Sequence, residues 1–365
     1  MIGRGRNRRM ALRYEDELRL FSTSGQKAGL VALILLYLLV PLNASEFWLS
    51  VLDYAGIAAI GAIGLNLLTG YTGQVSLGHA AFIGLGAYAA GYFGADLGLP
   101  LPLWLLAAAV CGGVIGALVG PFALRLRGNY LVIITLGLVF LGEHVYTNWD
   151  GLSGGTAGRN IEAPATLGID FDDLSLLGEE FTRNQSWFFL IWGLVALVAL
   201  LAKNLTRTRP GRALQAVRDR DVAAEVIGVS LARYKVGAFV ISSALAALAG
   251  ALLGAYQLYV APTEWTLFLS IQYLAIVIVG GLGTIFGGIV GALFVGSIPR
   301  LIEEYSGSIP GVAANAGDDG VITVFALNQA LFGLLIVVFL ILEPRGLAAM
   351  WIRVKTYFKG WPFGY

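Results

Sequence analysis

The amino-acid sequence predicts an all-α integral membrane protein with about ten transmembrane helices. Hydrophobic residues make up 57% of the chain and charged residues only 13%, whereas soluble domains contain about 45–50% apolar and about 25% charged residues. The apolar runs are roughly 15–25 residues long, close to the length that a helix needs to cross a bilayer. A membrane β-barrel would instead show alternating segments of about ten residues.

The apolar runs define the expected helices in chain order. A polar, basic leader at 1–27 precedes them, and we expect the first run to be a retained helix because no cleavage site ends it. The transmembrane domain covers 28–345 and a tail follows at 346–365. The expected spans lie at about 28–42, 48–69, 74–95, 101–122, 129–148, 187–202, 233–258, 268–282, 283–299 and 322–342. The eighth and ninth are short for a crossing, so we expect them to be tilted or partly re-entrant.

The basic residues orient these spans, because cytoplasmic loops of membrane proteins carry an excess of Lys and Arg. With the N-terminus in the cytoplasm, the loops at 149–186 and 300–320 lie outside and the segment at 203–232 lies inside. Only three of the 24 Lys and Arg residues then fall outside: Arg159, Arg183 and Arg300. The sequence therefore predicts that both termini are cytoplasmic.

Residues 64–91 combine apolar character with recurring glycines and uncharged polar residues. Glycine permits close approach of backbones, and polar groups within a membrane usually face protein or a water-filled path. We therefore interpret this stretch as the lining of a transport path, with its polar half serving as an inner gate. A second glycine-rich stretch at 279–296 would line the path as well. The second and third spans and the pair at 268–299 each turn on glycines, which suggests an internal repeat, although membrane helices are often rich in glycine. The candidate path or gate residues are Asn66, Thr69, Gly70, Thr72, Gly73, Gln74, Ser76, Gly78, His79, Gly281 and Gly283.

Several isolated residues allow more than one interpretation. His79 either bonds a neighbouring helix carbonyl or takes part in gating, and no Cys, Glu or second His stands at metal-ligand spacing from it. Asp53 is either solvated at the membrane edge or functional. Four tryptophans near predicted span ends are interpreted as interface anchors: Trp48, Trp104, Trp187 and Trp265.

The segment at 211–228 is predicted to be a short amphipathic helix between two spans. It begins after Pro210 and ends at Gly228, a residue suited to a helix C-terminus. Lipid docking would favour a purely basic polar face. Here the arginines share that face with Asp219, Asp221 and Glu225, which favours docking into another protein.

Six stretches together carry a family resemblance. They are GLNLLTGYTGQVSLGHAAFIGLGAYAA (64–90), LRLRGNYLVIITLG (124–137), GLSGGTAGRN (151–160), GRALQAVRDRDVAAEVIGV (211–229), VGGLGTIFGGIVGALF (279–294) and EPRGL (343–347). In these stretches the chain resembles the permease subunits of branched-chain amino acid ABC importers of the LivM type, within the LivH/LivM/RbsC-like permease family.

This resemblance implies a multi-pass protein of a bacterial or archaeal plasma membrane. Its partners would be membrane lipid, a second permease, two cytoplasmic ABC ATPases and an external solute-binding protein, with no nucleic acid. The chain itself would not be an enzyme and would hold no cofactor, since ATP and Mg would bind the partner ATPases. The segment at 211–228 would be the coupling element that sits in a groove of the ATPase. The implied coupling residues are Gly211, Arg212, Arg218, Arg220, Asp221, Glu225 and Gly228.

The implied cargo is a small amino acid, most simply leucine, isoleucine or valine. The family also includes importers of urea, amides and other small solutes, so an importer of the same class with another cargo is an alternative. The form AAEVIG at 223–228 favours amino acids. A secondary transporter or channel that works without ATP is an alternative of a different class. The near absence of charge within the spans argues against proton coupling.

The sequence also argues against nucleotide chemistry on this chain. The run at 152–155 reads LSGG, like the signature of ABC ATPases, but it lies in a predicted outer loop. No G-x-x-x-x-G-K-[ST] phosphate-binding loop occurs anywhere in the sequence. A membrane-embedded enzyme would need clustered nucleophiles, carboxylates or metal ligands within the spans, and the sequence contains no such cluster.

Overall fold

The computed structural model describes residues 24–124, 130–161, 175–176, 179–306, 312–313, 322–343 and 346–360. The chain divides into two compact units, Met1–Ala44 and Ser45–Tyr365. In the first unit the described segment is a single helix, α2 (Ser24–Asn43), whose apolar part corresponds to the first predicted span. Most of the basic leader, Arg125 and Arg127, large parts of both predicted outer loops and the end of the tail lie outside the described residues.

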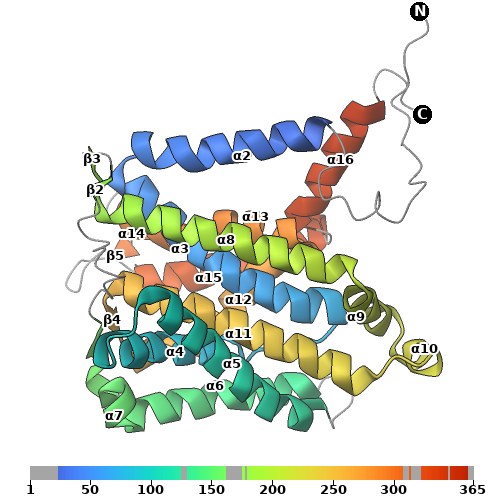
Figure 1. Cartoon of the computed structure of the whole chain (residues 1–365), viewed down its shortest axis with the longest axis horizontal. Coiled ribbons are helices and arrows are strands. Elements are labelled where there is room, and N and C mark those ends of the chain that lie inside the picture. Colours follow the sequence, from blue (N-terminus) through green and yellow to red (C-terminus); the bar gives the residue numbers. More distant parts are fainter. Residues whose placement is uncertain are drawn as a thin grey trace, which may run out of the picture. The chain divides into compact units, whose positions relative to one another are not determined.

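The second unit consists mainly of long helices that run side by side (Figure 1). Two π-helical segments, η1 (Asn66–Gly70) and η2 (Ala90–Asp96), continue the helices before them. The remaining helices are α3 (Glu46–Leu65), α4 (His79–Ala89), α5 (Leu101–Leu124), α6 (Tyr130–Asn148), α7 (Asp150–Ser153), η3 (Gly155–Ala157), α8 (Arg183–Arg207), α9 (Arg209–Asp219), α10 (Asp221–Val226), α11 (Leu231–Gln257), η4 (Pro262–Glu264), α12 (Leu267–Gly280), α13 (Ile285–Val295), α14 (Ile298–Tyr305), α15 (Val324–Leu342) and α16 (Gly346–Gly360).

Three pairs of two-residue strands lie at chain connections. Strands β1 (Arg159–Asn160) and β4 (Tyr259–Val260) pair antiparallel, with Arg159 opposite Val260. The other two pairs are β2 (Ser175–Leu176) with β3 (Glu179–Glu180), antiparallel, and β5 (Val312–Ala313) with β6 (Ile322–Thr323), parallel.

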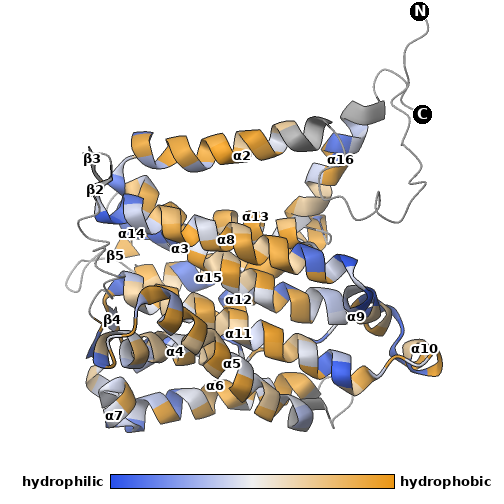
Figure 2. Cartoon of the chain, in the orientation of Figure 1, coloured by the Kyte–Doolittle hydropathy of each residue, from blue (hydrophilic) through white to orange (hydrophobic). Residues whose placement is uncertain are grey.

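Within the described ranges, seven helices are long and apolar enough to cross a membrane. They cover Glu46–Gly70, Leu101–Pro121, Leu131–Asn148, Arg183–Arg207, Leu231–Gln257, Ile285–Tyr305 and Val324–Leu342. Figure 2 shows apolar residues along these helices and hydrophilic residues gathered on α9. This is the pattern of a multi-pass membrane protein, and the count of ten spans with both termini cytoplasmic stays a prediction.

Helix α11 packs against α3, α4 and α5 through small residues. A Cβ on Gly86 of α4 would overlap the backbone carbonyl of Ala247 in α11, and a Cβ on Gly250 of α11 would overlap that of Ile83 in α4. The two backbones therefore touch, which is how membrane helices gain packing without a hydrophobic driving force between them. The glycines of the 64–91 stretch thus have a packing role besides any role in a path.

Replacing Gly250 with alanine is expected to destabilise the chain by roughly 1–3 kcal/mol, the usual cost of overpacking a tight core. Gly237 lies in the same helix, and a Cβ there would meet no atom within 4 Å. Gly237→Ala is therefore the matched control and can gain up to about 1 kcal/mol of helix propensity. Thermal unfolding of the two detergent-purified variants measures the difference. Equal midpoints would contradict the close α4–α11 contact.

The predicted third span, 74–95, is only partly helical, which corrects the sequence prediction. Residues 73–78 have no helical structure, and α4 begins at His79. Side chains of neighbouring elements replace the missing helical hydrogen bonds: Thr135 Oγ1 accepts from Leu77 N at 3.0 Å and Ser270 Oγ accepts from Ala80 N at 2.9 Å. Non-helical backbone within a membrane is tolerated only when it is buried in protein in this way, and no local sequence signal reports such distant partners.

Two other boundaries differ from the prediction. The predicted ninth span ended at residue 299, but α14 extends that apolar helix to Tyr305, so Ile285–Tyr305 reaches 21 residues. Helix α12 stays short at 14 residues. The single helix predicted at 211–228 is two helices, α9 and α10, with a break at Arg220, whose φ of −155° and ψ of 95° are those of extended backbone.

Three of the four predicted tryptophan anchors are core residues instead. Trp104, Trp187 and Trp265 are fully buried, whereas Trp48 is half exposed. Trp187 packs against Tyr256 with ring centroids 5.6 Å apart, and Trp265 against Tyr88 at 6.3 Å. Position near a span end does not distinguish an anchor from a core residue, because helices also pack against each other at their ends.

Candidate functional site

Asn66 joins the two glycine-rich stretches that the sequence singled out. Its side chain lies in the π-helical turn η1 and is almost fully buried. Its Nδ2 donates to Thr284 O at 2.7 Å and to Gly281 O at 3.4 Å, and its Oδ1 accepts from Gly283 N at 2.8 Å. One side chain therefore fixes the whole loop between α12 and α13 against the end of α3.

The loop itself depends on glycine. Gly281 and Gly283 have φ of 122° and 78°, which other residues rarely adopt. Thr284 then caps α13 by accepting from Gly287 N through its hydroxyl at 3.1 Å. Gly70 meets this loop directly, since a Cβ there would overlap Asn66 Oδ1 and Gly283 N.

Arg218 of α9 completes the cluster. Its guanidinium Nη1 donates a hydrogen bond to the backbone carbonyl of Gly70. A Cβ on Gly283 would lie 2.5 Å from the same nitrogen, and one on Gly73 would lie 3.6 Å from the Arg218 side chain. The segment predicted to couple and the two glycine turns predicted to gate therefore meet at one point, where Arg218, an exposed residue, bonds the bundle through its guanidinium.

Three uncharged polar residues surround that point. Thr72 donates to Leu68 O at 2.5 Å, and Gln74 Nε2 donates to Thr72 Oγ1 at 3.0 Å and to Lys235 O, at the start of α11, at 3.4 Å. Among the described residues, the buried Thr69 hydroxyl and Gln74 Oε1 find no hydrogen-bond partner.

His79 lies deeper in the bundle than Gly70, and Ser76 is buried in the non-helical segment before it. Ser76 Oγ accepts from Gly78 N at 3.2 Å. The buried ring of His79 packs against Tyr273 with centroids 4.9 Å apart, and Tyr273 lies about 10 Å along α12 from Gly280 at a rise of 1.5 Å per residue. The candidate path residues thus extend over a range of depths, and their role as an inner gate stays a prediction. Among the described residues no group of three or more His, Cys, Asp and Glu is arranged to hold a metal ion.

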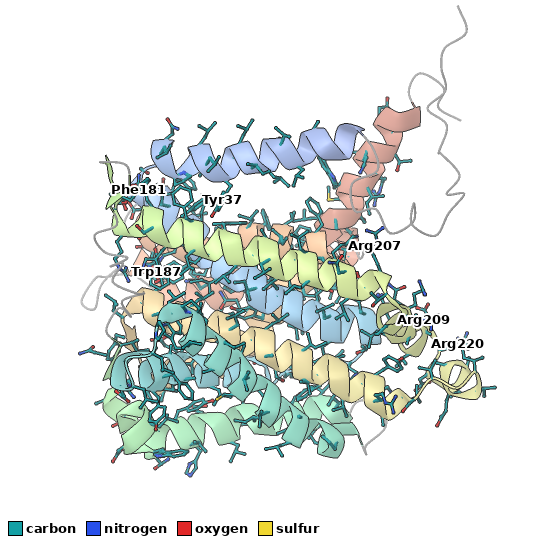
Figure 3. The ribbon with its side chains drawn as sticks, viewed as in Figure 1. Tyr37, Phe181, Trp187, Arg207, Arg209 and Arg220 are labelled. Carbon is teal, nitrogen blue, oxygen red and sulfur yellow. The ribbon has the colours of Figure 1, made fainter. Side chains whose placement is uncertain are left out.

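The coupling segment has a buried root and an exposed tip. Leu214 and Val217 of α9 are buried, and Gly211 packs on the backbone of Thr206. Beyond the break at Arg220, the large apolar side chains of α10 and of the residue after it are exposed, whereas Ala224 is buried. We call these exposed side chains the tip: Val222, Val226 and Ile227, exposed by 71%, 82% and 75%. Figure 3 shows Arg209 and Arg220 at this end of the molecule and Trp187 at the opposite end.

The remaining candidates of this segment are exposed. They are Arg212, Arg220, Asp221, Glu225 and Gly228, and Gly228 has φ of 89°. A hollow of about 450 Å³ is lined by residues 220–223. Asp221 lies 3.9 Å from Lys235, and this exposed pair adds little to stability. The exposed apolar side chains of the tip thus alternate along the chain with exposed residues of both charges, Arg220, Asp221 and Glu225.

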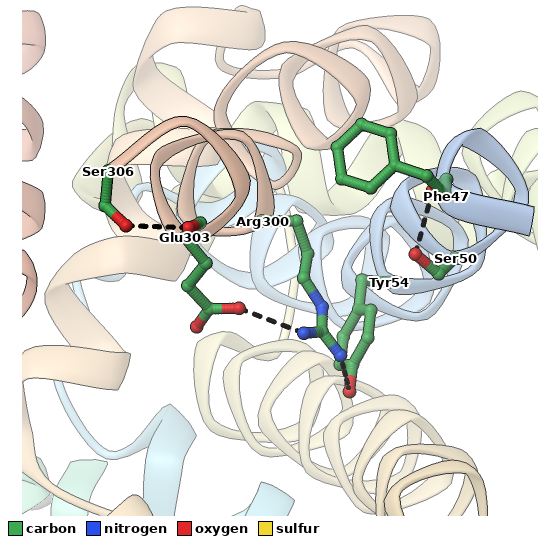
Figure 4. A network of polar contacts seen from close by, with 6 residues as sticks. All are labelled: Phe47, Ser50, Tyr54, Arg300, Glu303 and Ser306. Carbon is green, nitrogen blue, oxygen red and sulfur yellow. Dashed lines mark hydrogen bonds and ion pairs between the residues drawn. The ribbon is translucent and has the colours of Figure 1, made fainter. Parts of the chain in front are cut away.

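The opposite end holds a polar and aromatic network that the sequence did not reveal. Arg300 of α14 donates to Tyr54 OH at 2.7 Å and pairs with Glu303 at 2.9 Å (Figure 4). Its guanidinium also lies 4.3 Å from the Tyr54 ring centroid, and Tyr54 packs edge-on against Tyr256 at 5.1 Å. Tyr54 and Arg300 are 246 positions apart, so no local pattern could have paired them.

Asp53 lies beside this network and is fully buried, which removes the interpretation as a residue solvated at the membrane edge. Arg183 donates to Tyr256 O at 2.6 Å, tying α8 to α11. In the connection between α11 and α12, burial raises the pKa of Glu264 to about 7. Arg159 donates to Asp96 at 2.6 Å and to Leu152 O at 3.0 Å, and so fixes the glycine-rich loop of the GLSGGTAGRN stretch.

Comparison with known proteins decides the family. Residues 47–341 match the family described as "Branched-chain amino acid transport system / permease component". The chain belongs to this family. It is 31% identical to the high-affinity branched-chain amino acid transport system permease protein LivM of Escherichia coli, over 90% of this chain and 76% of that protein. This match confirms the predicted family. It also confirms the prediction that the chain is a membrane-embedded permease of the ABC importer class.

Other relatives carry different names. The fructose import permease protein FrcC of Rhizobium meliloti is 29% identical over 66% of each chain. The autoinducer 2 import system permease protein LsrC of Salmonella typhi is 26% identical over 78% of this chain and 80% of its own length. No solved structure matches the chain significantly. Family membership alone therefore does not give the cargo.

Proposed function

We propose that this chain forms part of the path for branched-chain amino acids in an ATP-driven importer. Support comes from the LivM proteins of Escherichia coli and Salmonella typhimurium, which match 90% of this chain at 31% and 30% identity. The relatives named for fructose and autoinducer 2 match less of it. A second permease, two ATPases and an external binding protein are the proposed partners, and ATP with Mg would bind only to the ATPases.

The polar groups of the candidate path suit a zwitterionic cargo. Residues 64–91 contain no Asp, Glu, Lys or Arg, and the buried Thr69 hydroxyl and Gln74 carbonyl are neutral. Neutral groups bind a zwitterion weakly, and weak binding permits release.

The observation that carries the proposed mechanism is the hydrogen bond from Arg218 to Gly70. Through it, movement of α9 acts directly on the glycine turn that ends α3, and Asn66 passes the movement to the loop at 281–284. The exposed tip would sit in a groove of the ATPase, while Arg218 transmits the motion. Docking and transmission are therefore assigned to different residues of one segment.

Arg218→Gln is expected to keep ATPase capture while lowering ATP-driven uptake about tenfold or more. The variant loses a charged hydrogen bond, worth roughly 1.5–3 kcal/mol, and 1.4 kcal/mol is a factor of ten in an equilibrium. Uptake in proteoliposomes and co-purification of ATPase subunits are measured together. Arg209→Gln, which changes an exposed arginine at the start of the same helix, is the control, and equal uptake by both variants would contradict the role of Arg218.

The wild-type complex tests the function itself. Leucine uptake should require ATP, ATPase subunits and binding protein, and excess isoleucine or valine should compete where urea and fructose do not. Uptake without ATP would indicate a secondary transporter or channel and overturn the proposal. Competition by urea or an amide in place of isoleucine would keep the importer class and replace the cargo.

A further inference from the structure

Helix α16, the last helix of the chain, leaves the bundle and exposes most of its surface. At its start, Gly346 has φ of 70° and packs so closely that a Cβ there would lie 2.6 Å from Gly281 N. From residue 350 to residue 357 every residue is exposed. Only the first turn of α16, which begins at Gly346, is therefore packed closely against the bundle.

The exposed part has one apolar face. Leu347, Met350, Trp351 and Val354 recur at the spacing i, i+3, i+4, i+7, which places them on one side of a helix. Met350, Trp351 and Val354 are exposed by 45%, 57% and 47%. Isolated apolar side chains on a surface are normal, but a continuous stripe of this kind indicates a contact surface.

The charged residues of α16 are all basic. The α16 sequence contains Arg353, Lys355 and Lys359 and no Asp or Glu, and both Arg353 and Lys355 are exposed. Helix α9–α10 differs, because Asp219, Asp221 and Glu225 lie among its arginines. A mixed face suits a protein groove, whereas a purely basic face suits anionic lipid.

The position of α16 places it at a membrane surface. Figure 1 shows α16 running steeply across the direction shared by α3, α8 and α11, at the end of the bundle where α9 and α10 lie. The Trp351 ring packs against Phe286, the second residue of α13, with centroids 6.4 Å apart. Trp351 thus lies level with the end of a membrane-crossing helix, where tryptophan is favoured at membrane interfaces.

An ion pair fixes the corner between the last span and α16. Glu343, the residue after α15, accepts from Arg353 at 2.5 Å. This holds α16 turned away from the axis of α15. Arg353 is therefore occupied within the chain, so the lysines of the α16 sequence are the cations that would meet a ligand.

We propose that α16 lies in the membrane surface at the α9–α10 end, with its apolar stripe in the lipid and its lysines on anionic lipid headgroups. The helix has the three features that such binding needs: an apolar stripe, a basic face and an orientation across the spans. It anchors the loop at 281–284 to the bilayer through Gly346. Lipid composition then acts on the same loop that Asn66 and Arg218 hold.

The test places a fluorescent label on each face of α16 in the full-length chain. The single native cysteine is removed as Cys111→Ser, and Val354→Cys or Thr356→Cys carries the label on the apolar or the polar face. Both positions are exposed and lie about 160° apart around the helix. In nanodiscs of phosphatidylcholine and phosphatidylglycerol, a nitroxide lipid should quench the label at 354 more strongly than the label at 356.

The charge is tested with matched variants. Lys355→Gln with Lys359→Gln should lower the equilibrium constant for attachment, taken from the quenched fraction, roughly fivefold for each lysine, since one cation near an anionic surface is worth about 1 kcal/mol. Lys355→Arg with Lys359→Arg should leave it unchanged. Equal quenching at both label positions, or equal attachment in discs of phosphatidylcholine alone, would overturn the proposal. Protection of position 354 only after ATPase subunits are added would show that α16 binds protein instead.

Discussion

Replacing Asn66 with alanine is expected to destabilise the chain and to abolish most ATP-driven uptake. The change leaves the partly buried Gly283 N–H and Thr284 C=O without their partner, and each such group costs up to roughly 1 kcal/mol, the low end of the range for a fully buried group. The loop at 281–284 loses the contact that fixes it to α3. Thermal unfolding in detergent and leucine uptake in proteoliposomes measure the two effects.

Asn148 provides the matched control. Its side chain also donates to a backbone carbonyl, that of His144 at 2.8 Å, but the bond is exposed and local. Asn148→Ala should therefore change neither unfolding nor uptake measurably. If Asn66→Ala behaves like Asn148→Ala, the two glycine-rich stretches are not held together by this side chain and the proposed transmission fails.

A second variant separates stability from transmission. Asn66→Asp keeps an oxygen that accepts from Gly283 N but replaces the donor to Thr284 O with a second acceptor. Repulsion between that acceptor and the carbonyl should give a loss of stability at least as large as in Asn66→Ala. Normal stability with low uptake in Asn66→Asp would show instead that the position matters for motion rather than for folding.

The sequence predicted which segments would matter but not how they touch. Hydropathy located the spans, and the distribution of arginines predicted their orientation. Both signals depend on the solvent around each helix, so they can be recognised in neighbouring residues of the sequence. The meeting of Asn66 with residues 281–284 joins positions more than two hundred apart. Such contacts depend on how helices pack, and a single sequence records no trace of the pairing.

The errors in prediction have a common physical origin. Residues 74–78 were expected to be helical because they belong to the predicted span at 74–95, yet Thr135 and Ser270 supply the hydrogen bonds that release them from a helix. Trp187 and Trp265 were expected at the lipid interface because they lie near span ends, yet neighbouring aromatic rings enclose them. In each case a tertiary partner overrode a preference that was correct locally.

The prediction for the segment at 211–228 was limited in the same way, because packing against the bundle decides which of its residues are exposed. The mixed charge of the segment predicted a protein partner, and its apolar residues were taken as one face of one helix. The break at Arg220 instead divides them, so Leu214 and Val217 hold α9 to the bundle while Val222, Val226 and Ile227 form the tip. Arg218, predicted on the docking surface, bonds Gly70.

Replacing Val226 and Ile227 with aspartate is expected to weaken capture of ATPase subunits at least tenfold, about 1.4 kcal/mol, without changing the stability of the isolated chain. Both side chains are more than two thirds exposed, so the fold loses no packing. A groove that covers them would instead have to bury unpaired carboxylates, which is strongly unfavourable. Co-purification and thermal unfolding measure the two properties, with Val226→Ile and Ile227→Val together as the control that keeps the apolar surface. Undiminished capture by the aspartate variant would place the docking surface elsewhere. Lost capture with an unchanged unfolding midpoint, compared with the Arg218→Gln result, would separate docking at the tip from transmission at Gly70.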